Sequence, residues 1–186
     1  MGTAHKRIAI FIDRDGVINY SPPHRFVTRW EQFRFLPRSL RALRMLKIHR
    51  QLVIVVSNQS AVGRRLMTRR RLQEITKRMK GIVRDAGGKI DAVNYCLHRP
   101  PAGCPCRKPR LGLLKRAARR FRIDLQRSFV VGDDKKDIEM GHAAGCRTVL
   151  VLSGKQTRSS ARRMVVPADR VAKDLLEAVQ WILRQR

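Results

Sequence analysis

Short apolar segments alternate with longer amphipathic segments along almost the whole chain of 186 residues. The apolar segments have the length of β-strands and lie at residues 8–12, 52–56, 90–95, 129–131 and 148–152. Apolar side chains at helical spacing predict helices over residues 36–46, 72–83, 113–121, 138–144 and 171–183. Buried strands that alternate with helices are typical of a parallel sheet covered on both faces, with right-handed crossovers. The sequence therefore predicts an α/β fold.

Two of the expected helices carry signals at their ends. Pro37 suits the first turn of the first helix, because that position needs no N–H donor. Thr68 is placed to cap the second helix, and Gly87 and Gly88 to end it.

The length favours a single domain over residues 1–186, since domains commonly span about 100–200 residues. No apolar run approaches the roughly 18–20 residues that a membrane helix needs. The first apolar stretch stops at Asp13, too short for a signal peptide, and has no cleavage site of small residues. We therefore expect a cytoplasmic protein with no membrane partner, and a monomer.

The chain carries 42 Lys+Arg against 14 Asp+Glu, a formal net charge of +28. Such a charge attracts polyanions, so nucleic acid, an anionic surface or a phosphorylated substrate are all candidate partners. A general basic bias is the favoured explanation, because the runs at 69–71, 115–120 and 158–163 fall on the polar sides of helices. Aromatic residues are only 5%, which disfavours binding by base stacking. We expect no specific nucleic-acid partner.

Polar side chains follow several of the expected strands where each strand ends, a place where open α/β sheets bind ligands. Asp13 and Asp15 follow the first strand, and Gly16 lets the backbone turn beside a ligand. One carboxylate could attack an electrophile and the other could move a proton. An ordinary Asp-Gly turn is the alternative.

Three further segments could handle a phosphate. The hydroxyl and N–H groups of Ser57 to Ser60 could hold phosphate oxygens, or cap the strand end. Lys108 could pair with a phosphate. Asp133 and Asp134 could hold Mg²⁺, which prefers carboxylate, phosphate and water oxygens, or could cap a helix.

Together these four segments resemble the haloacid-dehalogenase superfamily of phosphatases, and residues 11–19 are similar to its first motif. The resemblance implies a Rossmann-like fold without a large cap, and Mg²⁺-dependent phosphoryl transfer. It implies that Asp13 is the nucleophile that forms an aspartyl-phosphate and that Asp15 is the acid and base. It implies Mg²⁺ ligation by Asp13, Asp133 and the backbone carbonyl of Asp15, with Asp137 near the metal. It implies that Ser57 and Lys108 stabilise the transferring phosphoryl group.

A cluster of cysteines and one histidine lies in the irregular segment 96–109, at Cys96, His98, Cys104 and Cys106. In a cytosolic protein this set indicates a metal rather than disulfides, and three thiolates with one imidazole complete a tetrahedral structural Zn²⁺ site. Such a site would fold the loop and place Arg107 and Lys108. Cys146, far away in the chain, is expected to be a small buried residue.

This cluster, followed by Arg-Lys-Pro, resembles the D-glycero-D-manno-heptose 1,7-bisphosphate 7-phosphatase family and its relative, the histidinol-phosphate phosphatase. Residues 58–60 and 112–114 favour the heptose group, which implies a phosphorylated sugar as substrate. The substrate-binding residues expected from the resemblance are Ser21, His24, Asn58, Gln59, Ser60, Arg107 and Asp134.

The chain departs from that family's pattern at four positions. Ser57 replaces a commoner Thr, and Ala61 and Arg65 replace glycines. Asp134 stands where the family often has Lys, which puts an anion beside the expected Mg²⁺ and leaves the preference for a bisphosphate open. Histidinol phosphate, a nucleic-acid 3′-phosphate and a role without catalysis remain the alternatives.

Overall fold

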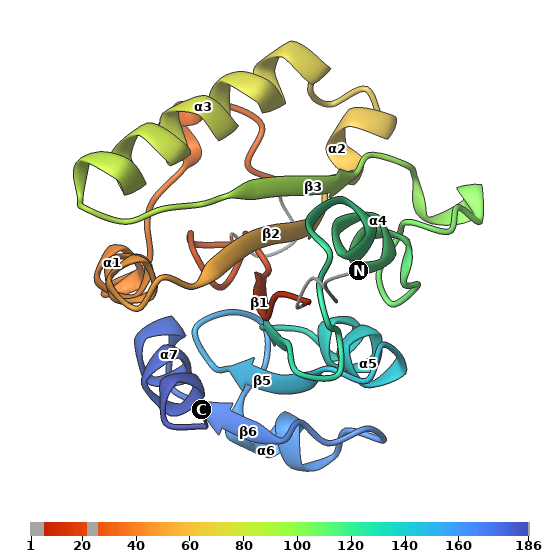
Figure 1. The fold of residues 1–186 in the computed structure, drawn as a ribbon. Coiled ribbons are helices and arrows are strands. Elements are labelled where there is room, and N and C mark those ends of the chain that lie inside the picture. Colours follow the sequence, from red (N-terminus) through yellow and green to blue (C-terminus); the bar gives the residue numbers. More distant parts are fainter. Residues whose placement is uncertain (1–5, 22–25, 186) are drawn as a thin grey trace, which may run out of the picture.

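A computed structural model describes residues 6–21 and 26–185 of the chain. Its six strands form one sheet in the order β3-β2-β1-β4-β5-β6, and every neighbouring pair is parallel (Figure 1). The strands are β1 (Ala9–Ile12), β2 (Leu52–Asn58), β3 (Ala92–Cys96), β4 (Phe129–Gly132), β5 (Arg147–Val151) and β6 (Arg170–Ala172). The expected parallel α/β fold is confirmed.

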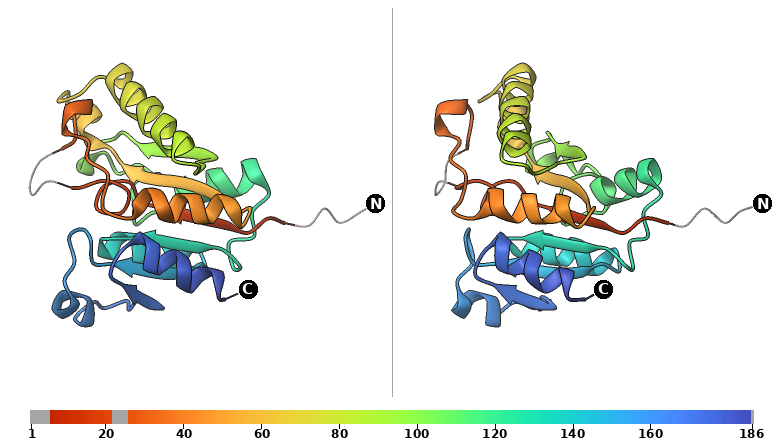
Figure 2. Two further views of the ribbon diagram at one scale, coloured as in Figure 1. Left: turned by 90° about the vertical axis from the view of Figure 1, so that its left-hand side faces the viewer. Right: turned by 60° about the vertical axis from the view of Figure 1, so that its left-hand side comes forward.

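Helices cover both faces of this sheet. They are α1 (Ser39–Ile48), α2 (Ser60–Gly63), α3 (Arg69–Asp85), α4 (Gly112–Phe121), α5 (Lys135–Ala143), α6 (Arg158–Arg162) and α7 (Leu175–Leu183), with short 3₁₀ helices η1 (Trp30–Gln32) and η2 (Pro100–Ala102). Helices α1, α3 and α7 pack on one face, and α4 and α5 on the other. Both views of Figure 2 show α1 and α7 side by side in front of the sheet.

The core has two apolar layers because side chains alternate along each strand. In β1, Ile10 and Ile12 belong to the layer under α1, α3 and α7, whereas Phe11 belongs to the layer under α4 and α5. All four residues of β1 are buried, as expected for a central parallel strand. None of the helices in the described residues is long and apolar enough to cross a membrane.

Helices α2 and α6 were not expected from the sequence, and two of the expected helices are placed differently. The first helix begins at Ser39, since Arg38 has a left-handed backbone (φ 64°), so Pro37 lies before the helix and not in its first turn. The expected helix over 171–183 is two elements: Val171 pairs with Leu150 in β6, and α7 begins after Asp174, whose side chain accepts a hydrogen bond from the Glu177 N–H. The Thr68 cap is confirmed, because its Oγ1 accepts from the Arg71 N–H.

The sheet register brings the expected site segments together. Ile12 pairs with Val55 of β2 and with Val131 of β4, and Asn58 pairs with Cys96 of β3. The residues that follow these strands therefore meet at the carboxyl edge of the sheet.

Candidate active site

A buried lysine and two carboxylates form the centre of this edge. The Lys108 ammonium lies 2.8 Å from Asp13 Oδ2 and 2.6 Å from Asp137 Oδ1, and it donates to the Val56 carbonyl at 3.1 Å. An ammonium has three N–H donors, so these three acceptors engage all of them. The two carboxylates hold the pKa of Lys108 above its usual value although burial lowers it. Lys108 therefore stays charged and offsets the charge of Asp13.

Three buried carboxylates converge beside this lysine. One carboxylate oxygen from each of Asp13, Asp133 and Asp137 lies within 4.8 Å of the others. Burial, followed by the charges of its two neighbours, raises the pKa of Asp133 to about 7. Burial and the charge of Asp13 raise the pKa of Asp137 to about 6, against the pull of Lys108. This concentration of anionic oxygens fits a hard divalent cation such as Mg²⁺.

Glycines on two loops make room for Asp133. A Cβ added to Gly16, which has φ +84°, would lie 2.2 Å from Asp133 Oδ2, and one on Gly154 would lie 2.1 Å from the same atom. The Asp133 carboxylate therefore sits in a cradle that any larger residue would fill. Its Oδ2 also accepts the backbone N–H of Lys155 at 3.0 Å, which ties the loop after β5 to the site.

Asp15 presents a separate carboxylate whose two oxygens are held by a network. Arg14 donates to it at 2.8 and 3.0 Å, Asn19 donates at 2.9 Å, and Gln59 donates at 2.7 Å. Burial raises the pKa of Asp15, but the Arg14 charge and these hydrogen bonds outweigh it and lower the pKa below the ordinary value. Asp15 is therefore ionised in the free protein, the form that a base requires.

Arg14, to which the sequence analysis assigned no role, orients this carboxylate. Its side chain is completely buried, and its guanidinium lies 6.0 Å from the ring centre of Phe33 and 5.9 Å from that of Tyr95. The sequence signal that could have identified Arg14 is its position between Asp13 and Asp15, the two expected catalytic aspartates. A buried guanidinium between two aromatic rings has little freedom to move, so it fixes the position of Asp15.

Residues 57–59, at the end of β2 and just after it, connect the two halves of the site. Gln59 Nε2 donates to Ser57 Oγ at 3.2 Å as well as to Asp15. Asn58 and Lys108 exchange hydrogen bonds between the Asn58 side chain and the Lys108 backbone, at 3.2 and 3.3 Å. The Asn58 and Gln59 amides therefore hold both the Asp15 carboxylate and the segment that carries Lys108.

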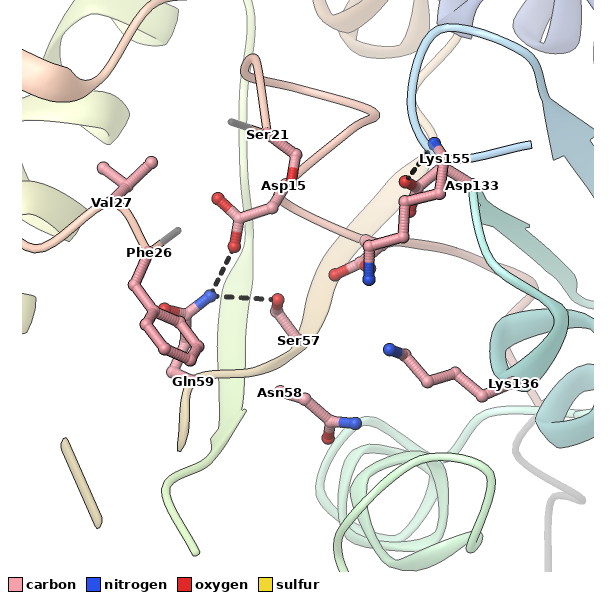
Figure 3. Close-up of a pocket in the computed structure, with 11 residues that line it drawn as sticks. Asp15, Ser21, Phe26, Val27, Ser57, Asn58, Gln59, Asp133, Lys136 and Lys155 are labelled. Atoms are coloured by element: carbon pink, nitrogen blue, oxygen red, sulfur yellow. Dashed lines mark hydrogen bonds between the residues drawn. The ribbon is translucent and has the colours of Figure 1, made fainter. Parts of the chain in front are cut away.

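A cavity of 320 Å³ opens over these groups (Figure 3). Its walls consist of Asp13, Asp15, Ser21, Phe26, Val27, Ser57, Asn58, Gln59, Asp133, Lys136 and Lys155. The sequence analysis anticipated Ser21, Asn58 and Gln59 as substrate-binding residues, and they do line it. It did not anticipate Phe26, Val27, Lys136 or Lys155, although Lys136 lies in the segment between Asp134 and Asp137.

The other expected substrate-binding residues lie elsewhere. Ser60 is buried at the start of α2, and the Arg107 guanidinium donates to the His98 carbonyl at 3.4 Å. Asp134 caps α5 and pairs with two lysines, which hold its pKa at about 2 although burial alone would raise it. These three are not among the residues that line the cavity. His24 lies outside the described residues.

Cys96, the last residue of β3, and the three Cys and His residues of the loop that follows come together as the sequence predicts. Cys104 Sγ lies 3.5 Å from Cys96 Sγ and 3.6 Å from Cys106 Sγ. His98 Nδ1 lies 3.3 Å from Cys106 Sγ and 3.8 Å from Cys96 Sγ. All of these cysteines are free thiols, and the cluster could hold one metal ion. Cys146 is buried elsewhere, as expected.

Comparison with known proteins identifies close relatives. A family model described as HAD-hydrolase-like matches residues 105–178. The D-glycero-β-D-manno-heptose-1,7-bisphosphate 7-phosphatase of Pseudomonas putida is 35% identical over 150 residues, which cover 81% of this chain and 85% of the relative. The protein of the same name from Bordetella bronchiseptica is 34% identical over 176 residues, covering 95% of this chain and 98% of the relative.

The fold agrees with these relatives. The crystal structure of D,D-heptose 1,7-bisphosphate phosphatase from B. bronchiseptica, complexed with magnesium and phosphate, matches this chain with a TM-score of 0.90 and 33% identity. The match covers 96% of this chain and 99% of that one. Relatives above 30% identity thus extend over nearly the full length, and the fold is shared. The chain belongs to the family of the D-glycero-β-D-manno-heptose-1,7-bisphosphate 7-phosphatases, within the haloacid-dehalogenase-like hydrolases.

Proposed function

We propose that this protein removes the 7-phosphate of D-glycero-D-manno-heptose 1,7-bisphosphate in a Mg²⁺-dependent reaction. The observation that carries the proposal is the Asp13 carboxylate, bound to Lys108 and next to Asp133, in the wall of the same cavity as Asp15. A nucleophile and an acid–base group that face one cavity suit a two-step transfer through an enzyme-bound phosphate. The names of the relatives supply the substrate.

In the first step, an Asp13 oxygen attacks phosphorus, and the bond between phosphorus and the C7 oxygen breaks. Asp15 donates a proton to that oxygen as it leaves. The negative charge of the bound phosphate raises the pKa of the adjacent Asp15, which supplies the protonated form. Lys108 neutralises Asp13, which would otherwise repel the substrate.

In the second step, Asp15 takes a proton from a water molecule that attacks phosphorus of the aspartyl-phosphate. The acyl-phosphate bond breaks, inorganic phosphate leaves, and the Asp13 carboxylate is regenerated. Asp13, Asp133 and the backbone carbonyl of Asp15 would hold Mg²⁺, with Asp137 beside them. Bound Mg²⁺ supplies positive charge that offsets the repulsion between phosphate and carboxylates.

We propose further that Cys96, His98, Cys104 and Cys106 hold one structural Zn²⁺. With zinc–sulfur bonds of about 2.3 Å, the corners of a tetrahedron lie about 3.8 Å apart. The separations of 3.3 to 3.8 Å between these atoms support a tetrahedral site. Four protein ligands leave no open position, so this metal would shape the loop that leads to Lys108 and take no part in hydrolysis.

A turnover screen tests the substrate. The purified protein with Mg²⁺ is given both anomers of the heptose 1,7-bisphosphate, histidinol phosphate and a 3′-phosphorylated oligonucleotide, with the Asp13→Asn variant as the blank. We expect the highest kcat/KM with a heptose bisphosphate and release of the 7-phosphate alone. A higher kcat/KM with histidinol phosphate or with the oligonucleotide would refute the proposal.

A further inference from the structure

We propose that Lys136 and Lys155 form the subsite for the second, non-reacting phosphate of the substrate, and that Asp134 positions them. The inference rests on the proposed function, since it assigns the part of the same cavity that would recognise a bisphosphate. It concerns the surroundings of Asp134, a position where the family resemblance led us to expect a lysine.

The two lysines come from different elements and reach the same cavity. Lys136 lies in the first turn of α5, and Lys155 lies in the loop after β5. Both line the cavity with Asp13 and Asp15, and Figure 3 shows both side chains extending into it. Their position in the wall places two cations beside the groups that would carry out the chemistry.

Asp134 holds the ammonium groups of Lys136 and Lys155 close to each other. Its Oδ2 lies 3.1 Å from Lys136 Nζ and 3.0 Å from Lys155 Nζ. Two ammonium groups that share one oxygen atom are close enough for a single phosphate to contact both. Lys155 is further restrained by its backbone N–H, which donates to Asp133. The pair is thus oriented before a ligand arrives, which reduces the entropy lost on binding.

These lysines, unlike Lys108, have donors to spare. Each ammonium has three N–H groups, and Asp134 is the acceptor found for each within residues 6–21 and 26–185. Lys108 is buried, and its three N–H groups already donate to three protein acceptors. Among the described residues that line the cavity, Lys136 and Lys155 are the cationic ones. An additional phosphate in the cavity would therefore be bound there.

The same arrangement explains how Asp134 is compatible with an anionic ligand. One carboxylate and two ammonium groups leave a net charge of +1 at this wall of the cavity. Asp134 directs its Oδ1 to the Lys136 backbone N–H at the start of α5. The negative charge of Asp134, which the sequence places beside the expected Mg²⁺, is therefore offset by Lys136 and Lys155. These two lysines give this wall of the cavity its net positive charge.

The test compares two substrates in three variants. Lys136→Met and Lys155→Met each remove one ammonium, and Lys135→Met removes an exposed ammonium from the same helix as a matched control. For each protein, kcat and KM are measured with the heptose 1,7-bisphosphate and with the heptose 7-phosphate. We expect each of the first two changes to raise KM for the bisphosphate on the order of tenfold more than KM for the monophosphate, as for a lost charged hydrogen bond.

The control Lys135→Met should change neither KM by more than about twofold, as for an ordinary surface substitution. An equal loss for both substrates would show that the lysines contact the transferred phosphoryl group instead. No loss for either substrate would show that they form no subsite. Either result would overturn the inference while leaving the proposed function intact, whereas a wild-type protein inactive on both substrates would refute the proposed function itself.

A binding measurement tests the subsite without turnover. D-mannose 1-phosphate, which has a sugar 1-phosphate but no 7-phosphate, is titrated calorimetrically into Asp13→Asn protein with and without the Lys136→Met and Lys155→Met changes. We expect both changes to weaken binding about tenfold, by the same loss of a charged hydrogen bond. Binding that is absent, or unchanged by both substitutions, would contradict the subsite whatever the natural substrate is.

Discussion

Asp13 and Asp15 are two residues apart in the chain but lie in different electrostatic surroundings. Asp13 faces Lys108 and shares its surroundings with the buried carboxylates Asp133 and Asp137. The Asp15 carboxylate instead accepts hydrogen bonds from Arg14 and Gln59. This separation suits two different roles, because a nucleophile must stay ionised next to a metal while an acid–base group must exchange a proton with the substrate.

Asp13→Asn is expected to abolish turnover, because an amide cannot form the acyl-phosphate. Asn has nearly the same size and shape as Asp, so the fold should persist, as checked by circular dichroism. Single-turnover quenching of the wild-type protein should trap phosphate on Asp13. Asp85→Asn, at an exposed ion pair with Arg84, is the matched control and should keep wild-type activity. Activity of Asp13→Asn within tenfold of wild type would contradict the assignment.

Asp15→Asn is expected to slow both half-reactions, by roughly 10²–10⁴-fold each, the usual contribution of a positioned proton-transfer group. Rapid-quench measurement of aspartyl-phosphate formation and decay separates the two steps. With p-nitrophenyl phosphate the first step should suffer less, since this leaving group needs little protonation. Equal slowing of the first step with the sugar phosphate and with p-nitrophenyl phosphate would argue that Asp15 does not act as the acid.

At the scale of elements, the site is assembled by strand ends and by the loops between them. Asp13 follows β1, Ser57 is the last residue but one of β2, Asp133 follows β4, and Lys108 lies in the loop after β3. The parallel register brings these ends to one edge. The loop over residues 96–109 has little apolar core of its own, and its Cys and His side chains lie close enough together to hold one metal ion.

Loss of the proposed zinc is therefore expected to disorder this loop. Elemental analysis should find about one zinc per chain, by the four-ligand argument, and Cys104→Ser should lose it. The change should lower kcat and raise KM together, because the loop leads to Lys108, and added Mg²⁺ should not restore activity. Cys146→Ser, a change at a buried thiol outside the cluster, should retain the zinc. Full activity of zinc-free wild-type protein would refute the structural role.

At the scale of the whole molecule, the net charge of +28 is far larger than one active site requires. The basic side chains of α3 include exposed residues well away from the cavity, such as Arg70, Lys77 and Lys80. Charge spread over solvated helix faces interacts with any polyanion through counterion release, without reading its sequence.

The protein is accordingly expected to bind duplex DNA weakly and without sequence preference. Fluorescence anisotropy with two unrelated duplexes of equal length should give equal dissociation constants, and affinity should fall steeply between about 50 and 200 mM salt. Turnover of a 3′-phosphorylated oligonucleotide should not exceed the Asp13→Asn blank. A tight complex with one sequence that survives high salt would instead indicate a dedicated nucleic-acid function.

Much of this molecule follows from local sequence alone. The apolar run 52–56 predicts a strand and the helical spacing of apolar residues over 72–83 predicts a helix. Each element must bury one face or both, so its apolar side chains recur with the period of that element wherever it lies in the fold. The motif around Asp13 places two carboxylates two residues apart, and Cys104 and Cys106 have the same spacing. Such groups can be recognised from a few neighbouring residues. The parallel fold and the metal-ligand cluster could therefore be anticipated.

Only the tertiary structure decided how distant residues combine. Lys155 meets Asp134 from 21 positions away, and Arg14 lies between the rings of Phe33 and Tyr95, which come from separate segments. Val171 lies in a strand and not in a helix because it pairs with the edge of the sheet at β5. Such contacts depend on strand order and on packing across the sheet, and neither is encoded in local periodicity. For that reason the sequence pointed to the carboxylates that we propose as catalytic, and the structure pointed to the lysines beside them.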